Sequence, residues 1–415
     1  MIHQVHLPDV TRRRLTDVVR LQVRLLHYAA LTATPDATSC AHYLDQSIRF
    51  RGRGTQIARW LWRAPKRHRA LETFAQGPAA EKWQWYQRVS REALAFLHNR
   101  SDSPSPHRDK NAIPWQKAGA IFLRNFYDDL CEPSGLPSYL FAQHGAIPFR
   151  RQDFLARFEQ ANRGLYVCAV CDETLYRTVV DGDVYSEIEH YLPKSRYPHL
   201  ACHPFNLLPI CSSCNRLKGS VDPLQGRTGN RHDLEDILLP YREPGLGSRT
   251  YLHVQLGRTP DTTQLSQLRP RPAIDLHQRI ATFAGVYKVP KRWQGQIKTI
   301  EDTLFRRIRH ALQLGWYASR GGTMPQILLA VLDQLLEVLH EAQGQEPFAF
   351  AMTWWLATLI NQEVEPATRN PAHPMPQLSI LLQALSIDTS VQSGTGLPTS
   401  SAQFGTARSL RGLLQ

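Results

Sequence analysis

No stretch of this sequence approaches the run of about 18 apolar residues that a membrane-spanning helix needs. The first residues, MIHQVHLPDVTRRR, also lack the apolar core of a signal peptide. No segment recurs at a fixed period, which argues against a repeat architecture. These absences predict a soluble, cytoplasmic protein with no membrane partner.

The size and charge of the chain narrow its class further. Its 415 residues are too many for one ordinary compact domain, and 42% hydrophobic side chains are enough to fill well-buried cores. Lys and Arg number 49 against 36 Asp and Glu, which gives a formal charge of +13. A surplus of this size favours a polyanionic partner, although charge alone does not identify one.

Apolar residues recur every three or four positions along much of the chain, which predicts helices. One such stripe runs from Trp85 to Leu97, a second from Ala118 to Leu130, and a third through Ile327, Val331, Leu335 and Val338. Short apolar runs at 184–193, 207–213, 237–245 and 249–257 read as strands, and 214–220 reads as the start of a helix. We therefore expect an α+β fold that is mainly helical and carries a small embedded strand–loop–strand–helix module.

Four parts are expected along the chain. Residues 1–150 form a helical, basic domain that binds nucleic acid or a partner, and residues 151–245 contain the embedded module. Residues 246–385 form a C-terminal domain with strands followed by helices. Residues 386–415 are poor in large apolar side chains and are expected to be a flexible tail.

Four of the seven cysteines form two C-x2-C pairs, Cys168 with Cys171 and Cys211 with Cys214. In an intracellular chain this spacing indicates metal binding rather than disulfides. Zinc suits four thiolates, and four protein ligands leave no open position for water, so we expect a structural zinc site. A chance arrangement of unrelated cysteines and an iron–sulfur cluster are the alternatives.

Polar residues between and beside these pairs suit the hydrolysis of a phosphodiester. Glu189 and His190 end the first expected strand, Asn206 precedes the second, and Asn215 follows Cys214 at the start of the helix. An imidazole is suited to take a proton from water near neutral pH. A hard cation that offsets charge on a phosphate needs oxygen ligands, which Glu189 and Asn215 can supply.

These residues carry a family resemblance. E-H-Y-L-P-K-S at 189–195 and N-L-L-P-I-C-S-S-C-N-R-L-K-G at 206–219 resemble the HNH, or ββα-metal, nucleases that hold a zinc ion with two C-x2-C pairs. The resemblance covers roughly residues 166–222. It implies a zinc-stapled ββα-metal module that cleaves DNA as an endonuclease and leaves 5′-phosphate and 3′-hydroxyl ends.

The resemblance also implies a role for each polar residue. His190 would be the general base and Asn206 the catalytic-site residue that fixes the connecting loop. Glu189 and Asn215 would hold the catalytic Mg²⁺ or Mn²⁺. Glu stands here where the family more often has Asp, and Asn215 stands in place of the last His, so the departures concern metal preference and rate rather than reaction class.

Within the superfamily, E-H-x-x-P-K-S-x-Y-P and the long helical flanks resemble HNH subunits of bacterial antiphage systems such as Septu and retron-linked nucleases. That resemblance implies a role in antiviral defence and a protein partner, such as a defence-system ATPase. A free-standing restriction or mobile-element endonuclease fits the same core.

Basic residues outside this core are candidates for gripping a nucleic acid. Residues 49–69 contain eight Lys or Arg and no acidic residue, with Phe50, Trp60 and Trp62 among them. The predicted contacts in this stretch are Arg49, Arg51, Arg53, Arg59 and Arg63. The alternative is a basic helix face whose tryptophans belong to the core.

Four further residues lie close to the expected site. Lys194 and Lys218 are candidate phosphate contacts, although a solvated surface position is the alternative for each. His199 and His203 are expected at the surface, with a secondary role as auxiliary metal or phosphate contacts.

Two other functions stay open at the level of the sequence. The first is a non-catalytic zinc module that binds nucleic acid or a protein partner, and the second is an RNA-cutting toxin on the same core. The trio of Glu189, His190 and Asn215 favours catalysis, because a zinc staple alone does not need it. DNA and RNA are not separated, because the chemistry acts on the phosphate.

Overall fold

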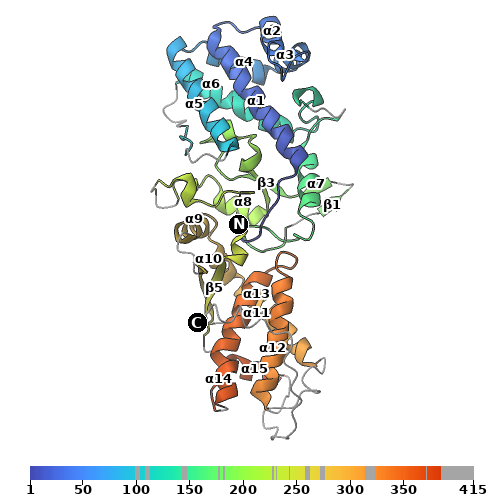
Figure 1. The fold of residues 1–415 in the computed structure, drawn as a ribbon, viewed down its shortest axis with the longest axis vertical. Coiled ribbons are helices and arrows are strands. Elements are labelled where there is room, and N and C mark those ends of the chain that lie inside the picture. The colour runs from blue at the N-terminus through green and yellow to red at the C-terminus, as the bar shows by residue number, and fades with distance from the viewer. Residues whose placement is uncertain are drawn as a thin grey trace. The chain divides into compact units, whose positions relative to one another are not determined.

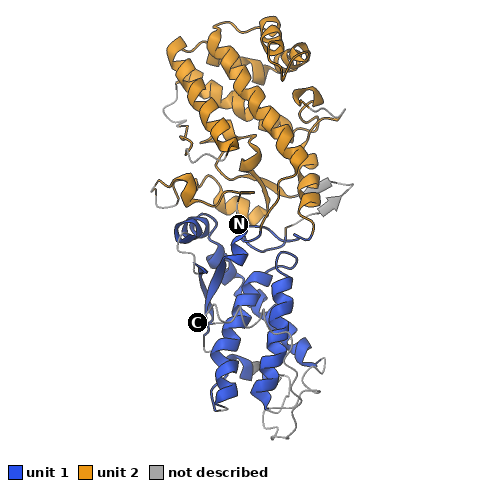
Figure 2. Cartoon of the chain, viewed as in Figure 1, with its two compact units in different colours: residues 1–3, 164–174, 245–415 blue, residues 4–163, 175–244 orange. Residues whose placement is uncertain are grey.

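The computed structural model describes residues 1–98, 103–107, 113–142, 147–175, 178–180, 183–226, 229, 231–242, 244–257, 262–271, 276–313, 323–370 and 372–384. The predicted tail at 386–415 lies outside these residues. Two compact units make up the chain (Figure 2). Unit 1 contains Met1–His3, Gly164–Thr174 and Gly245–Gln415, and unit 2 contains Gln4–Arg163 and Leu175–Pro244.

Helices dominate both units, and the strands of the described chain form three two-stranded antiparallel sheets, as Figure 1 shows in part. The prediction of a mainly helical α+β protein is confirmed. Among the described helices, none combines the length and the apolarity needed to cross a bilayer.

Unit 2 has eight helices and four short strands among its described residues. The helices are α1 (Asp9–Leu31), α2 (Ala37–Asp45), α3 (Gly54–Arg63), α4 (Pro65–Ala75), α5 (Ala79–Leu97), α6 (Pro114–Cys131), α7 (Arg151–Ala161) and α8 (Ser212–Lys218). The strands are β1 (Thr178–Val180), β2 (Asp183–Tyr185), β3 (Glu187–His190) and β4 (Leu207–Ile210).

The core of unit 2 forms where α1 packs against α4 and α5. The two predicted apolar stripes contribute to this core: Trp85 and Val89 of α5 belong to it, as do Phe122 and Phe126 of α6. Phe122 and Phe126 meet edge to face with their ring centroids 5.4 Å apart. Burial of such a stripe removes apolar surface from water, which is the main stabilising contribution in a helical unit.

In unit 1 the part that follows Gly245 has a sheet and then helices. Its elements are β5 (Thr250–Gln255), β6 (Gln264–Pro270), α9 (His277–Tyr287), α10 (Val289–Gly295), α11 (Ile297–Gln313), α12 (Met324–Glu341), α13 (Ala349–Leu359), a π-helical turn at Ile360–Val364, α14 (Glu365–Arg369) and α15 (Pro376–Ala384). Every residue of α13 is buried, which makes it the central helix of this unit.

Two sequence interpretations were wrong in this region. The described residues of 237–245 form no strand, because Pro240 has no N–H for a ladder and Tyr241 has a positive φ of 65°. The strand that pairs with β5 is instead β6, with a register shift between His253 and Val254. On α12, Val338 is 45% exposed, because the buried face is centred on Leu328, Leu332, Leu336 and Leu339.

Candidate active site and metal centre

The four cysteines of the two C-x2-C pairs lie together. Their Sγ atoms are all within 4.8 Å of one another, and all four residues are buried. Sulfurs held tetrahedrally by zinc at about 2.3 Å would lie roughly 3.8 Å apart. None of the seven cysteines forms a disulfide. The donor set is therefore compatible with a structural zinc ion.

The first pair lies in a tight turn that the neighbouring backbone shapes. Cys168 N donates to the carbonyl of Glu173 at 2.7 Å, and Asp172, with φ of 64°, reverses the chain after Cys171. The carboxylate of Asp172 accepts from His3 Nε2 at 2.5 Å and from Phe350 N at 2.9 Å. The indole of Trp293 donates to the carbonyl of Cys171 at 2.8 Å. These bonds anchor the turn to α10 and α13.

The second pair lies where β4 gives way to α8. Cys211 is the residue before the helix, and its Sγ accepts from the backbone N–H of Cys214 at 3.4 Å. The helix ends at Gly219, whose positive φ of 49° suits glycine. The chain thus supplies two sulfurs from one helical turn, held by the strand that precedes it.

The predicted strand–loop–strand–helix order is present as β3, a connecting loop, β4 and α8. In the antiparallel ladder Glu189 pairs with Leu208 and His190 with Leu207. Figure 1 shows β3 and α8 in the same part of unit 2. The local pattern of the sequence therefore predicted the backbone that carries Glu189, His190, Asn206 and Asn215.

His190 is oriented by its surroundings. Its Nε2 lies 3.0 Å from the carbonyl oxygen of Ala201, which can only accept, so the proton is on Nε2 and Nδ1 keeps its lone pair. The ring meets Tyr127 of α6 edge to face, with centroids 4.2 Å apart. Burial lowers the pKa of His190 to about 3, and the nearby Lys194 adds to this effect. The imidazole is therefore neutral, as a general base requires.

Glu189 faces a buried partner. The ammonium of Lys218, at the end of α8, donates to the carboxylate of Glu189 and to the backbone carbonyl of His190 at 2.9 Å. Burial raises the pKa of Glu189, and the charge of Lys218 offsets part of that effect. Lys218 was predicted to contact phosphate, but it is only 1% exposed and does not lie at the surface.

Asn206 is fully buried and bonded along the loop that connects β3 to β4. Its Oδ1 accepts from Leu192 N at 2.7 Å, and its Nδ2 donates to the carbonyls of Leu192 and Leu200, each at 3.0 Å. These bonds hold the loop that follows His190 against the sheet.

Asn215 lies in the first turn of α8 and is half-buried. Its side-chain amide makes no hydrogen bond with any residue that the structure describes. Its oxygen is thus available to a ligand, unlike the carboxylate oxygen of Glu189 that accepts from Lys218.

The expectation that His199 and His203 lie at the surface is wrong. His199 is 3% exposed and its Nε2 lies 3.3 Å from Oε2 of Glu92 on α5, whereas His203 is fully buried with its ring edge-on to Phe96 at 4.8 Å. Burial lowers the pKa of His199 to about 3 and raises the pKa of Glu92. With a pKa of about 3 the His199 ring is neutral near pH 7, so its contact with Glu92 is not an ion pair. The two histidines help to join the connecting loop to α5.

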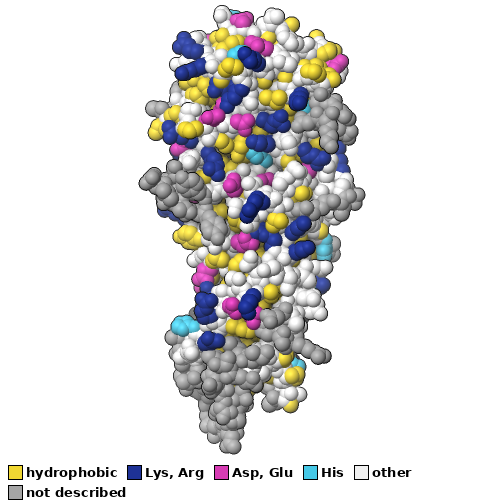
Figure 3. Space-filling view, turned by 180° about the vertical axis from the view of Figure 1, so that it is seen from behind, with side chains coloured by type: hydrophobic (Ala, Val, Ile, Leu, Met, Phe, Trp, Pro, Cys, Tyr) yellow, Lys and Arg dark blue, Asp and Glu magenta, His cyan; other side chains and the backbone are white. Residues whose placement is uncertain are grey.

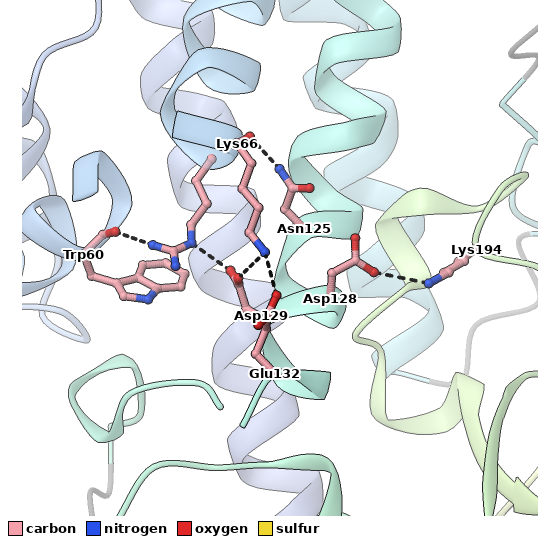
Figure 4. A network of polar contacts seen from close by, with 8 residues as sticks. Trp60, Lys66, Asn125, Asp128, Asp129, Glu132 and Lys194 are labelled. Carbon is pink, nitrogen blue, oxygen red and sulfur yellow. Dashed lines mark hydrogen bonds and ion pairs between the residues drawn. The ribbon is translucent and has the colours of Figure 1, made fainter. Parts of the chain in front are cut away.

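Part of the basic stretch 49–69 is bonded within unit 2, as Figure 4 shows. Lys66 lies 3.0 Å and Arg67 lies 2.8 Å from the carboxylate of Asp129. Lys66 also lies 3.3 Å from Glu132, and the guanidinium of Arg67 stacks over Trp60 at 4.1 Å. These two cations therefore brace α4 against α6.

Most of the aromatic residues in this stretch belong to the core, which was the alternative to base stacking. Phe50 and Trp60 are buried, and Trp60 meets Phe126 edge to face at 5.5 Å. Trp62 is half-buried and stacks on His68, with centroids 6.4 Å apart. Base stacking on Phe50 or Trp60 would require these side chains to leave the core.

The predicted nucleic-acid contacts differ in how exposed they are. Arg51, Arg59 and Arg63 are exposed, whereas Arg53 donates to the backbone carbonyls of Tyr139 and Phe141. Arg49 is ion-paired with Asp17, and Lys194 lies 3.3 Å from Asp128 at the surface. On the face drawn in Figure 3, Lys and Arg side chains are interspersed with Asp and Glu.

Three residues make contacts near the site that the sequence does not indicate. The sequence singles out Lys218 as a candidate phosphate contact but not as the partner of Glu189, and it indicates Tyr127 only as part of a helix. Asp222, fully buried, accepts from Arg196 at 3.0 Å and from the hydroxyl of Tyr197 at 2.8 Å, which ties the connecting loop to the chain after α8. Sequence reasoning missed these partners because each comes from a different element.

Comparison with known proteins gives one partial likeness. The chain is 53% identical over 68 residues to a protein of Bacillus thuringiensis named Septu protein PtuB. The match covers 16% of this chain and 24% of that protein, so the chain spans about a quarter of the relative's length. No family model matches the sequence, and no solved structure matches the fold.

Proposed function

We propose that this protein is a metal-dependent HNH-type endonuclease that hydrolyses phosphodiester bonds of DNA. The observation that carries the proposal is the orientation of His190, whose Nε2–H is bound by a backbone carbonyl so that Nδ1 can accept a proton. A zinc staple does not require a buried, neutral imidazole in a fixed tautomer beside a carboxylate.

In the proposed reaction His190 Nδ1 takes a proton from a water molecule, and the water oxygen attacks phosphorus. The P–O3′ bond breaks, the leaving 3′ oxygen takes a proton from solvent, and the products are a 5′-phosphate and a 3′-hydroxyl. A divalent cation such as Mg²⁺ or Mn²⁺, when bound, would offset negative charge on the phosphate and the leaving oxygen. Glu189 and Asn215 are the residues of this chain that would hold it.

The buried ammonium of Lys218 has a positioning role in this proposal. It engages one oxygen of Glu189, which leaves the other oxygen as the candidate ligand. Asn206 has a comparable role through the backbone of the connecting loop, which holds Ala201 and hence the His190 ring. A zinc ion on the four cysteines would fix the ends of the module.

A role in antiphage defence is part of the proposal. It is supported by the likeness to a protein whose name contains Septu and by the resemblance of the E-H-x-x-P-K-S-x-Y-P segment to such nucleases. A second protein, such as an ATPase of the same system, would then restrain or direct the nuclease. Co-expression with candidate neighbours and phage challenge would test this part separately.

A non-catalytic zinc module is the second candidate. The ion pair of Glu189 with Lys218 favours it, because the carboxylate already has a partner within the protein. The two functions are separated by incubating purified protein with plasmid, single-stranded DNA and tRNA, after dialysis and then with added Mg²⁺ or Mn²⁺. Cleavage by the wild type and not by the His190→Gln variant supports the nuclease. Cleavage that His190→Gln leaves unchanged contradicts it.

A further inference from the structure

A cavity of about 690 Å³ opens on unit 2 along the first half of α1. Five arginines line it: Arg12, Arg13, Arg14 and Arg20 from α1, and Arg49 from the turn after α2. Asp17 is the one acidic residue among its lining residues. We call this cavity the arginine pocket. Its lining carries a formal charge of +4, and only Arg49 belongs to the contacts predicted from the sequence.

The placement of these arginines opposes the electrostatics of the helix. The N-terminal end of a helix carries a partial positive charge, so cations there are unfavourable and anions are favourable. Arg12 and Arg13 nevertheless lie in the first turns of the 23-residue helix α1. Asp9 pairs with Arg12 at 2.8 Å and offsets one of these charges. A local choice that costs stability is typical of a functional position.

Arg14 provides a second and independent observation. It is only 9% exposed, and its guanidinium lies over the rings of Phe141 and Phe149 at 5.4 and 5.3 Å. Among the residues that the structure describes, it forms neither a hydrogen bond nor an ion pair. A buried guanidinium without such a partner is costly, and Arg14 is one of the residues that line the pocket.

The one acidic residue of the pocket is already bonded. One oxygen of Asp17 accepts from Arg49, and the other accepts from the backbone N–H of Ala142 at 2.7 Å. Arg20, like Arg14, forms neither a hydrogen bond nor an ion pair with a described residue. Burial and the neighbouring Arg49 lower the pKa of Arg20, which agrees with crowding of positive charge.

The wall of the pocket is fixed by Arg53. Its guanidinium donates to the carbonyls of Tyr139, at 2.9 Å, and Phe141, and also to the carbonyl of Arg49. These bonds join the turn that carries Arg49 to the segment that ends at Ala142. The pocket is therefore a built concave site rather than a solvated helix face.

We propose that the arginine pocket binds phosphate groups of a nucleic-acid backbone. Planar guanidinium groups bind phosphate oxygens in bidentate fashion, and none of the lining residues offers an aromatic ring on which a base could stack. The pocket would therefore hold the substrate by its backbone without reading sequence. That the phosphates belong to a nucleic acid rests on the proposed function.

The test uses the full-length protein and the Arg20→Glu variant, with Arg309→Glu, at an exposed position of α11, as the matched control. Binding of a fluorescein-labelled 20-base-pair duplex is measured by anisotropy across a salt series without divalent cations. Arg20→Glu should weaken binding about tenfold or more and should lower the slope of log K against log salt by about 0.9 for each phosphate that the variant no longer neutralises. Arg309→Glu should stay within about twofold of the wild type, and both variants should unfold at the wild-type temperature.

Inorganic pyrophosphate is the second probe and identifies the source of the phosphate. Pyrophosphate should compete with the duplex for the arginine pocket of the wild type. It should not compete with duplex binding in the Arg20→Glu variant. If Arg20→Glu abolishes pyrophosphate binding and leaves duplex binding unchanged, the pocket serves a free polyphosphate and the assignment to nucleic acid is overturned. Equal effects of Arg20→Glu and Arg309→Glu on the duplex would also overturn it.

Cleavage assays keep this inference separate from the proposed function. If the wild type cuts no nucleic acid but binds the duplex in a manner that needs Arg20, the nuclease proposal fails and the arginine pocket stands. If it cuts DNA and Arg20→Glu binds the duplex as well as the wild type does, the pocket proposal fails and the nuclease stands.

Discussion

The ammonium of Lys218 donates to the carboxylate of Glu189, and both side chains are almost completely buried. The pair joins the end of α8 to β3, next to the candidate general base. Removal of one partner from a buried ion pair leaves the other charge without compensation, which typically costs about 3–5 kcal/mol.

Lys218→Met should therefore lower the free energy of unfolding by about 3–5 kcal/mol. Lys194→Met is the matched control, because Lys194 pairs with Asp128 at the surface, where such pairs are worth about 0–1 kcal/mol. Urea unfolding followed by fluorescence measures both. A Lys218→Met protein as stable as Lys194→Met would show that the buried pair makes no net contribution.

Removal of one sulfur from the four-cysteine cluster should remove zinc and stability together. Structural zinc contributes on the order of 10 kcal/mol of binding free energy in small zinc domains, and three remaining ligands cannot retain most of it. Cys214→Ser should show no bound zinc by elemental analysis and a strongly lowered melting temperature. Cys131→Ser, at an exposed cysteine outside the cluster, should keep both. A wild-type protein that contains no zinc and has the same melting temperature as Cys214→Ser would contradict the structural zinc site.

Much of the candidate site could be predicted because its signals are local. Each of these signals is a short pattern of neighbouring residues. They are the two C-x2-C pairs, the residues at the end of β3 and the residues at the start of α8. The burial of Lys218, His199 and His203 could not be predicted in this way. Their partners Glu189, Glu92 and Phe96 come from other elements, and sequence spacing does not say which face of a segment the tertiary fold covers.

The same reasoning explains the errors in the rest of the fold. An apolar run such as 237–239 is buried whether it is a strand or an irregular segment, so periodicity does not separate the two. Strand β6 carries only Leu265 and Leu268 as buried apolar residues, so it gives a weak signal. On α12 apolar residues occur around most of the helix, and packing rather than pattern decides that Val338 is exposed.

Acid should destabilise the protein through His199. Its pKa of about 3 in the folded state lies below the value of about 6.5 in an unfolded chain. Between these values the unfolded state binds more protons, so stability is present above pH 6.5 and is lost as the pH falls toward 3. From pH 7.5 to 5.5 this one group should cost about 1.4 kcal/mol.

The His199→Gln variant isolates this contribution from that of Glu92, whose raised pKa acts in the opposite direction. Urea unfolding at pH 7.5 and 5.5 should give a smaller difference for His199→Gln than for the wild type. The same substitution at exposed His42 on α2 is the control and should leave the difference unchanged. An identical pH dependence in His199→Gln and the wild type would show that this histidine does not titrate with unfolding.

The exposed and bonded arginines of residues 49–63 should differ in what they contribute. Substitution of Arg51, Arg59 and Arg63 together by Gln should weaken duplex binding and lower its salt slope by about 0.9 for each phosphate that these arginines neutralise, with little change in melting temperature. Arg53→Gln should instead lower the melting temperature, because its guanidinium bonds two backbone carbonyls of the 139–141 segment. Anisotropy across a salt series measures the effect of each variant on duplex binding, and thermal unfolding measures its effect on stability.

The proposed chemistry is tested most directly at His190. Gln can keep a donor near the position of Nε2, and so can keep the bond to the carbonyl of Ala201, but it cannot accept a proton from water. His190→Gln should therefore retain its zinc and its fold and lose roughly 100-fold or more in cleavage rate, the usual scale of a lost general base. Asn215→Ala should show a different defect, a higher Mg²⁺ or Mn²⁺ concentration for half-maximal cleavage, because it removes an oxygen ligand rather than the base. Nicking of supercoiled plasmid across a metal series measures both, and wild-type rates in His190→Gln would rule out this histidine as the base.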